Sequence, residues 1–200
     1  MEETFTFDRS DYRSDVNFSD YYWFNAAFSS EELTKIESMT SNLEWETAAT
    51  GQDETVNVSD YRKSKIKWCP QNNTWSWVYE KLHNMLVEAN NVMWKFDLTH
   101  MRETIQYTEY YGGGGHYDWH MDCGSGIQSQ RKISVTVQLS DPNDYVGGDL
   151  QFNLGGDFKT APRIQGAAVI FPSFYLHRVT PVKSGTRKSF VLWVGGEPYK

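Results

Sequence analysis

The chain has 200 residues with 19 basic and 26 acidic side chains, which gives a formal net charge of −7. This length suits one domain that buries its own core, and an aromatic content of 16% excludes disorder over most of the chain. There are only two cysteines, no apolar run long enough for a membrane span, and no apolar signal core after the acidic start, so we expect a soluble, cytoplasmic protein.

The charge is unevenly distributed along the chain. Residues 1–60 hold 14 acidic side chains against three basic ones, whereas the rest of the chain is mildly basic. A protein that binds duplex nucleic acid usually presents a dominant basic face. The sequence therefore disfavours nucleic acid as a partner and indicates a solvated acidic N-terminal face.

Two helices are predicted in the N-terminal part. The first has an apolar stripe of Leu33, Ile36, Met39 and Leu43, preceded by Ser29 and Glu32 at the spacing of a capping box. The second stripe comprises Trp75, Val78, Leu82, Met85, Leu86 and Ala89, with Asn73 or Thr74 as the expected N-cap. Both stripes are expected to pack on a core. The polar segments 42–67 and 123–130 are either mobile substrate loops or ordinary loops.

From about residue 92 the pattern changes to short strands. Alternating or apolar runs occupy residues 92–98, 104–110, 133–139, 150–154, 167–171 and 189–194, with Gly-, Asp- and Asn-rich turns between them. Strands of this kind predict a sandwich or barrel, here a double-stranded β-helix (jelly roll). The fold class is thus α+β, a single domain over residues 1–200. Residues 1–91 form a supporting region of helices and N-terminal strands, and residues 92–200 form the jelly-roll core.

The candidate metal ligands are three histidines and two nearby aspartates. Residues two apart on a strand share a face, so His116-x-Asp118 and His120-x-Asp122 each present an imidazole and a carboxylate together. His177 on a later strand would complete the 2-His-1-carboxylate set typical of non-haem Fe(II) sites. All four side chains of the two pairs have the same parity, so spacing alone does not choose between the pairs.

Arg187 lies ten residues after His177. The sequence between them indicates a strand, a hairpin turn at Ser184-Gly185 and the start of the last strand, which would return Arg187 close to His177. Taken alone, Arg187 could equally be a surface residue. Beside a metal site it fits a 2-oxoacid, whose far carboxylate matches the planar guanidinium.

Several stretches resemble the prolyl-4-hydroxylase-type 2-oxoglutarate oxygenases, in particular the bacterial and phage members. They are Tyr111-x-x-Gly114-x-x-Tyr117-x-x-His120-x-Asp122, Leu139-Ser140-Asp141-Pro142 with Gly147-Gly148-Asp149-Leu150, and Pro172-Ser173 through His177-Arg178-Val179-Thr180-Pro181 to Gly185-Thr186-Arg187. The resemblance covers residues 104–195, and the N-terminal helices carry no specific motif of the family.

The resemblance implies a role for individual residues. His120, Asp122 and His177 match the iron ligands, which leaves His116 and Asp118 outside the site, and Arg187 matches the partner of the 2-oxoglutarate C5 carboxylate. Other positions match or face the cosubstrate pocket of relatives: Tyr110, Trp193, Ser134, Thr136 and Gln138. Some relatives carry a tyrosine where Gln138 stands, so the second contact to the C5 carboxylate falls to Thr136 or Gln138.

The activity implied by the resemblance is that of an Fe(II)- and 2-oxoglutarate-dependent dioxygenase. It would consume O2, release succinate and CO2, use ascorbate as reductant and hydroxylate a prolyl residue in a peptide or protein. No catalytic side chain beyond the metal ligands is required.

Three other functions fit parts of the sequence. The same chemistry could act on a free amino acid, another small molecule or a nucleobase, although Lys188 stands after Arg187 and no second arginine follows, which counts against nucleobase repair. A catalytically silent jelly-roll binding module would have no reason to keep the complete ligand set. A zinc or manganese cupin-type enzyme would not need Arg187.

Overall fold

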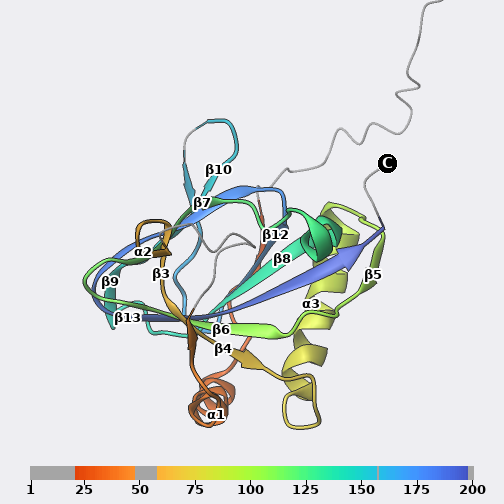
Figure 1. Ribbon diagram of the computed structural model, residues 1–200. Helices are drawn as coiled ribbons and strands as arrows, with labels where there is room; N and C mark the ends of the chain where they lie inside the picture. Colours follow the sequence, from red (N-terminus) through yellow and green to blue (C-terminus); the bar gives the residue numbers. More distant parts are fainter. Residues whose placement is uncertain (1–20, 48–57, 157, 198–200) are drawn as a thin grey trace, which may run out of the picture.

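The computed structural model describes residues 21–47, 58–156 and 158–197, and it consists of two facing antiparallel sheets with the two longest helices packed outside one of them (Figure 1). In the major sheet the strand order is β1 (Tyr22–Phe24), β12 (Ala168–Pro172), β8 (Arg131–Gln138), β13 (Leu176–Gly196), β6 (Ile105–Tyr111), β4 (Lys65–Cys69) and β2 (Glu46–Thr47). The minor sheet contains β3 (Arg62–Lys63), β7 (Gly115–His120), β13, β10 (Leu150–Asn153) and β11 (Lys159–Thr160). Two short strands also pair with β13: β9 (Tyr145–Gly147) pairs with its middle, Val182–Gly185, and β5 (Leu98–His100) pairs with its C-terminal end.

Strand β13 belongs to both sheets. Its first half pairs with β7, β9 and β10, and its second half pairs with β6 and β8. The predicted hairpin between His177 and Arg187 is therefore wrong. Register shifts bend one continuous strand instead, as bulges do where a strand changes sheet. Gly185 has φ +74°, and a Cβ there would lie 1.9 Å from the carbonyl oxygen of Asp144, so only glycine fits this position.

Helix α1 (Ser30–Ser41) begins as the sequence predicts. The Ser29 hydroxyl accepts a hydrogen bond from the backbone N–H of Glu32, and the Glu32 carboxylate accepts one from the backbone N–H of Ser29. This reciprocal capping box satisfies donors that the first helical turn leaves free. The structure also contains a short helix α2 (Val58–Tyr61) and a 3₁₀ helix η1 (Gly126–Gln130).

Helix α3 (Ser76–Met93) differs from the prediction at both ends. Asn73 and Thr74 do not cap it; the Asn72 side chain accepts the backbone N–H groups of the turn that precedes the helix. At the other end the helix takes in the first two residues of the segment predicted as the strand 92–98, and strand β5 begins only at Leu98. The helix stops where the Asn90 side chain bonds both backbone groups of Phe96 and Lys95 takes φ +54°.

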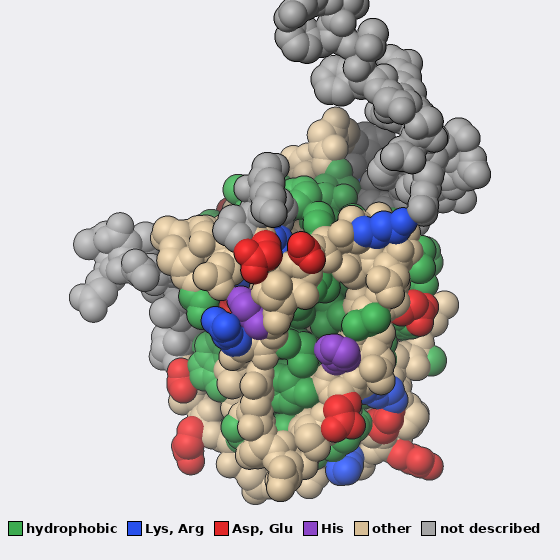
Figure 2. All heavy atoms as spheres, turned by 90° about the vertical axis from the view of Figure 1, so that its right-hand side faces the viewer, with side chains coloured by type: hydrophobic (Ala, Val, Ile, Leu, Met, Phe, Trp, Pro, Cys, Tyr) green, Lys and Arg blue, Asp and Glu red, His purple; other side chains and the backbone are tan. Residues whose placement is uncertain are grey.

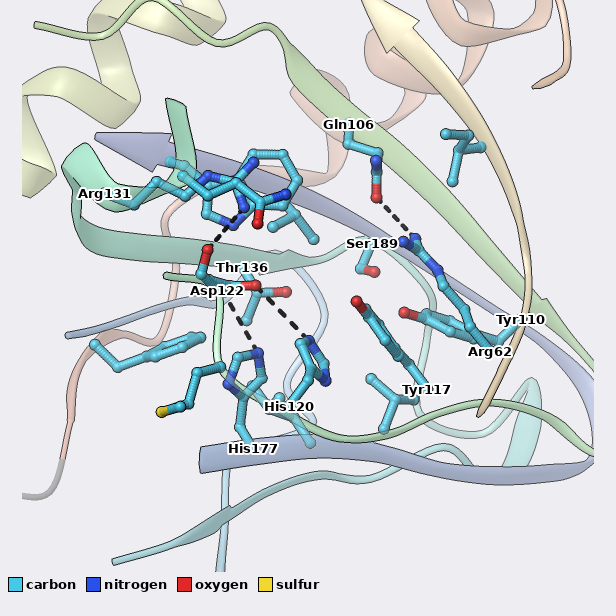
Figure 3. Close-up of a pocket in the computed structure, with 18 of the residues that line it drawn as sticks. Arg62, Gln106, Tyr110, Tyr117, His120, Asp122, Arg131, Thr136, His177 and Ser189 are labelled. Atoms are coloured by element: carbon cyan, nitrogen blue, oxygen red, sulfur yellow. Dashed lines mark hydrogen bonds and ion pairs between the residues drawn. The ribbon is translucent and has the colours of Figure 1, made fainter. Parts of the chain in front are cut away.

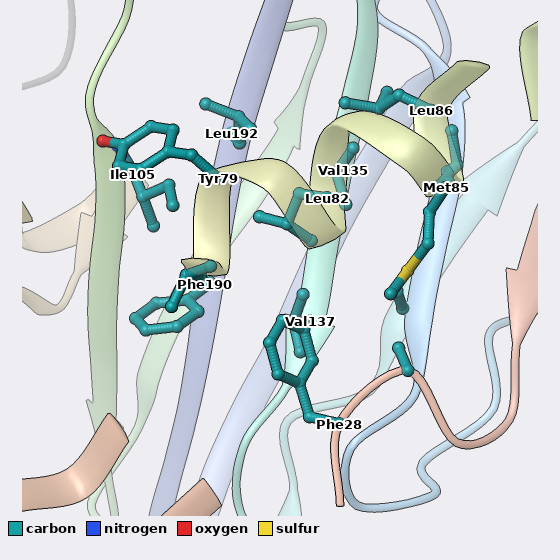
Figure 4. Close-up of a cluster of buried hydrophobic side chains, with 14 of the residues drawn as sticks. Phe28, Tyr79, Leu82, Met85, Leu86, Ile105, Val135, Val137, Phe190 and Leu192 are labelled. Atoms are coloured by element: carbon teal, nitrogen blue, oxygen red, sulfur yellow. The ribbon is translucent and has the colours of Figure 1, made fainter. Parts of the chain in front are cut away.

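The main core lies between helix α3 and the outer face of the major sheet (Figure 4). Alternate residues of the central strands point toward the helix: Ile133, Val135 and Val137 of β8, and Phe190, Leu192 and Val194 of β13. Because side chains alternate along a strand, the residues between these point toward the minor sheet. They form the floor of the space between the two sheets.

Among the described residues, none of the helices is both long enough and apolar enough to cross a membrane. On the face in Figure 2, Lys and Arg side chains stand singly among acidic and polar ones and do not form a continuous basic patch.

A buried His-Asp-His cluster and its cavity

A cavity of about 550 Å³ lies between the two sheets and collects most of the predicted site residues (Figure 3). The major sheet contributes Gln106, Tyr110, Thr136, Arg187, Ser189 and Trp193 to its wall. The minor sheet and the loop after β7 contribute Arg62, Tyr117, His120, Asp122, His177 and Val179. The double-sheet arrangement therefore places titratable side chains in one cavity between the sheets.

Three predicted ligands, His120, Asp122 and His177, meet at one end of this cavity. His120 and His177 are register partners on β7 and β13, and all three side chains are buried. The Nε2 atoms of His120 and His177 lie 3.7 and 3.6 Å from different oxygens of the Asp122 carboxylate. One ligand atom from each residue falls within 4.8 Å of the others, which suits a single metal ion.

Backbone carbonyls fix the tautomer of both histidines. The Nδ1 atom of His120 lies 2.7 Å from the carbonyl oxygen of Asp118, and that of His177 lies 2.8 Å from the carbonyl oxygen of Tyr175. Since a carbonyl oxygen only accepts, each Nδ1–H donates. Both Nε2 lone pairs are then free to coordinate a metal.

The protonation states also fit metal coordination. Burial, with repulsion from His177, lowers the pKa of His120 to about 3, so its imidazole is neutral. Burial alone would raise the pKa of Asp122, but the imidazoles of His177 and His120 and the hydroxyl of Ser134 hold it below its ordinary value. A charged Asp122 carboxylate beside the neutral imidazole of His120 can bind a divalent cation without either group first losing a proton.

The structure separates the two His-x-Asp pairs that spacing left equivalent. His116 hydrogen-bonds the carbonyl oxygens of Gly114 and Asp60 on the β3 side of the strand, and Asp118 is exposed. The predicted common parity is wrong, because three residue steps of β7 face two steps of β13 between the pairs Tyr117↔Val179 and His120↔His177. This bulge turns Tyr117 and His120 toward the cavity together, with their rings stacked at 3.5 Å.

Arg187 lies in the same cavity, 3% exposed. Its Nη1 donates to the hydroxyl of Ser189 at 3.2 Å, and its guanidinium lies 5.5 Å from the ring centroid of Tyr110, its register partner on β6. Within the described residues no carboxylate pairs with it. Burying a charge without a counter-charge is costly, and among the described residues this guanidinium lacks an anionic partner.

The remaining predicted residues divide between two cavities. Tyr110, Thr136 and Trp193 line the main one, and the Trp193 indole N–H has no acceptor among the described residues. Gln138 lies in a smaller adjoining cavity that also contacts Arg187 and Thr136. Its amide donates to the hydroxyl of Tyr145 at 2.8 Å.

Two residues of the site make contacts with Asp122 that the sequence did not predict. The hydroxyl of Ser134 donates to the Asp122 carboxylate at 2.6 Å, and Arg131 donates to the Asp122 carbonyl oxygen while it ion-pairs with Glu103. Strand parity had placed Ser134 on this face without giving it a partner. Arg131 lies in no motif of the sequence, and only the structure shows what it contacts.

Comparison with known proteins supports the resemblance noted from the sequence. Residues 105–195 match the 2OG-Fe(II) oxygenase superfamily. A PKHD-type hydroxylase of Colwellia psychrerythraea is 40% identical over 84 residues, which is 40% of this chain and 38% of the relative. A PKHD-type hydroxylase of a Polaromonas species is 37% identical over 100 residues, covering 46% and 43% of the two chains. The matched part thus spans less than half the length of these relatives.

Solved structures show the same fold over most of the chain. A prolyl hydroxylase from Trichoplax adhaerens, in complex with a peptide fragment of hypoxia inducible factor, aligns with a TM-score of 0.74 at 18% identity, over 90% of this chain and 86% of the other. A Pseudomonas putida prolyl-4-hydroxylase aligns with a TM-score of 0.64 at 19% identity, over 92% and 96%. The predicted double-stranded β-helix is confirmed. The superfamily and the His-Asp-His cluster together imply Fe(II) and 2-oxoglutarate.

Proposed function

We propose that the chain, whose residues 105–195 match the 2OG-Fe(II) oxygenase superfamily, is an Fe(II)- and 2-oxoglutarate-dependent dioxygenase that hydroxylates a prolyl residue in a peptide or protein. One observation carries the proposal. A buried cluster of two imidazoles and a carboxylate shares one cavity with a buried arginine that has no acidic partner among the described residues. A 2-oxoacid with a second carboxylate requires both groups: a metal site that its oxoacid end chelates, and a cation that pairs with its far carboxylate.

The three ligands would hold Fe(II) through the Nε2 atoms of His120 and His177 and the carboxylate of Asp122. When bound, the iron supplies the oxidising chemistry with O2 and 2-oxoglutarate, and ascorbate serves as the external reductant. The protein fixes the ligand geometry: the carbonyls of Asp118 and Tyr175 orient the two rings, and Ser134 and Arg131 hold Asp122.

Arg187 would orient the cosubstrate by pairing with its C5 carboxylate. Ser189 occupies only one N–H of the guanidinium, which leaves a fork of donors for two carboxylate oxygens. In the role of second donor we place Thr136, which lines the main cavity. Gln138 is already bonded to Tyr145 and would act through that phenol, whose own O–H remains free to donate.

The aromatic walls would keep the reacting end dry and orient the substrate. Tyr117 covers one face of the His120 ring, and burial raises the pKa of its phenol well above the ordinary value, so the phenol stays neutral. The Trp193 N–H, which has no acceptor in the described part of the chain, provides a donor on the floor of the cavity. No proton-transferring side chain is needed beyond these orienting groups.

The assignment of a peptide substrate rests on similarity and on the shape of the site. The names of the sequence relatives and the Trichoplax complex point to prolyl and peptide chemistry in those proteins. In this chain Met121, which lines the cavity, is half-exposed, so part of the cavity wall is accessible to a peptide. We also include a cytoplasmic setting in the proposal, supported by Cys69 and Cys123, both of which are free thiols.

Succinate formation tests the proposal directly. With Fe(II), 2-oxoglutarate, O2 and ascorbate, proline-containing peptides should stimulate succinate release and gain one oxygen atom, whereas the same peptides with alanine for proline should not. His177→Ala should abolish both signals, and His116→Ala, which removes a histidine outside the cluster, should retain them. Hydroxylation of free amino acids but of no peptide would correct the substrate, and failure of every substrate to stimulate succinate release would contradict the dioxygenase assignment.

A further inference from the structure

A second buried guanidinium, that of Arg62, lines the same cavity. Arg62 lies on β3, pairs in register with Tyr117 on β7, and is 6% exposed. Its Nε donates to the hydroxyl of Ser64 at 2.9 Å, and its Nη2 donates to the amide oxygen of Gln106 at 2.8 Å (Figure 3). Both acceptors are neutral. No carboxylate of the described residues forms an ion pair with Arg62.

Other arginines near this region have acidic partners. Arg131, on the same cavity wall, pairs with Glu103, and Arg163 pairs with Asp149. Only Arg62 and Arg187 combine full burial with the lack of a carboxylate partner among the described residues, and both face the cavity. Because an uncompensated buried charge is costly, Arg62 calls for the same explanation as Arg187.

The cosubstrate 2-oxoglutarate does not supply the negative charge that Arg62 lacks. Of the acidic side chains that line the cavity, Asp122 is engaged by the histidines and Ser134, and Glu46 is exposed and accepts from the Trp68 indole. A divalent cation and doubly charged 2-oxoglutarate cancel each other in formal charge. With the cosubstrate extended from the ligand cluster to Arg187, Arg62 remains uncompensated.

The position of Arg62 relates it to the reacting end of the cavity. Its guanidinium stacks over the Tyr117 ring at 4.5 Å, and the opposite neighbour of that ring is His120, at 3.5 Å. One aromatic ring therefore separates Arg62 from a metal ligand. The two stacking distances place the guanidinium at most about 8 Å from the His120 ring, roughly the length of two extended residues, so an anion bound to Arg62 would lie close to the residue that reacts.

We propose that Arg62 binds a carboxylate of the substrate, so that the preferred substrate carries an anionic group immediately beside the hydroxylated residue. This inference rests on the proposed function. The carboxylate can be the C-terminus of the substrate or an acidic side chain next to the target residue. Both sources offer the planar, bidentate acceptor that a guanidinium recognises.

Matched pairs of neutral and anionic probes test the inference by calorimetry on protein loaded with Mn(II) and 2-oxoglutarate. N-acetylproline is compared with N-acetylprolinamide for the C-terminal carboxylate, and acetyl-Pro-Asp-amide with acetyl-Pro-Asn-amide for the side chain. In at least one pair the anionic probe should bind about 10- to 100-fold more tightly, the range expected for a hydrogen bond to a charged group. Arg62→Gln should bring that ratio close to one.

Two further variants separate recognition from structure. Arg62→Lys keeps the charge and should retain part of the preference, and Arg178→Gln, which removes a guanidinium bonded to Gln151 outside the cavity, should leave it unchanged. Equal affinity within both pairs in the wild-type protein, including no detectable binding of any probe, overturns the inference even if Arg62→Gln fails to fold. A loss of 2-oxoglutarate affinity in Arg62→Gln as large as in Arg187→Met would assign the carboxylate to the cosubstrate and overturn it too. Failure of the proposed function gives a different result, because 2-oxoglutarate would then not bind the Mn(II)-loaded wild-type protein at all.

Discussion

The ligand cluster depends on a few neighbours that set the protonation and direction of each side chain. Carbonyl oxygens hold both Nδ1–H groups, and one hydroxyl, that of Ser134, bonds the Asp122 carboxylate inside the protein. The same hydroxyl lies 2.9 Å from the hydroxyl of Ser173, whose carbonyl oxygen accepts the Asp122 backbone N–H. The carboxylate is thus fixed through its side chain and its backbone.

Ser134→Ala should weaken metal binding without unfolding the protein. Among the described residues, Ser134 is the one hydroxyl that donates to this carboxylate, and loss of such an outer partner typically lowers metal affinity about 10- to 100-fold. Titration with Mn(II) measures the effect. Ser129→Ala is the matched control, because that hydroxyl bonds only the carbonyl oxygen of Gly126 at the surface. Equal affinities in the two variants would contradict the role given to Ser134.

The buried thiol of Cys69 should be unreactive, and it should make the free energy of unfolding fall as the pH rises above about 8. Burial raises the pKa of its thiol from 9.0 to about 12. Because the pKa is higher in the folded chain, the neutral thiol favours the folded state. Its contribution to the free energy of unfolding is complete below pH 9 and is lost as the pH rises toward 12. The free energy of unfolding in urea should therefore fall between pH 8 and pH 10.5, and fall less in Cys69→Ala. In the native protein iodoacetamide should modify the partly exposed Cys123 first. An identical pH dependence in the variant would refute this.

Residue identities at the cluster could be predicted from the sequence, but their surroundings could not. The His-x-Asp spacing and a distant histidine narrow the ligands to two sets, and the family resemblance selects the set that the structure brings together. The sequence around Arg62 and Arg131 does not predict a role in the site, because most of their contacts are with residues on strands and loops distant in the sequence. Gln138 shows the same limit, because its bond to Tyr145 depends on where β9 pairs with β13.

At the scale of elements, two irregular strands build the site. The bulge in β7 turns Tyr117 and His120 to one side, and the bends in β13 carry one strand from His177 in the minor sheet to Arg187 in the major sheet. Strand alternation predicts β6, β8, β10 and β12 closely, because these strands are regular. It fails at β7 and β13, where one extra residue reverses the face of every residue that follows.

The helix layer should contribute to stability and not to the chemistry. Leu82 of α3 is fully buried between the helix and the sheet, so Leu82→Ala should lower the free energy of unfolding by about 2–5 kcal/mol. Val87 of the same helix is 43% exposed, and Val87→Ala should cost far less. Urea unfolding measures both, and Mn(II) affinity at a temperature where both variants are folded should match the wild type. A selective loss of metal affinity in Leu82→Ala would contradict this division of roles.

At the scale of the whole molecule, we propose that the chain is a single domain. Strands from both halves share one sheet, because β1 pairs with β12 and β4 pairs with β6. The N-terminal segment also contributes directly to the cavity through Arg62 on β3. The expected acidic excess of residues 1–60 falls partly outside the described residues, as does part of the segment 42–67 considered as a substrate loop.

The central claim is that the cluster and Arg187 bind a metal and 2-oxoglutarate together. Thermal unfolding with Mn(II), a redox-silent substitute for Fe(II), tests it in the wild type, His120→Ala, Arg187→Met and His116→Ala. A ligand at about 100 times its dissociation constant adds roughly 2.7 kcal/mol, a rise in melting temperature of about 5–10 °C for a chain of this size. The account predicts that 2-oxoglutarate produces this rise only with Mn(II) present, and only in the wild type and His116→Ala. A rise that is independent of Mn(II), or that persists in Arg187→Met, or no rise in the wild type, would contradict it.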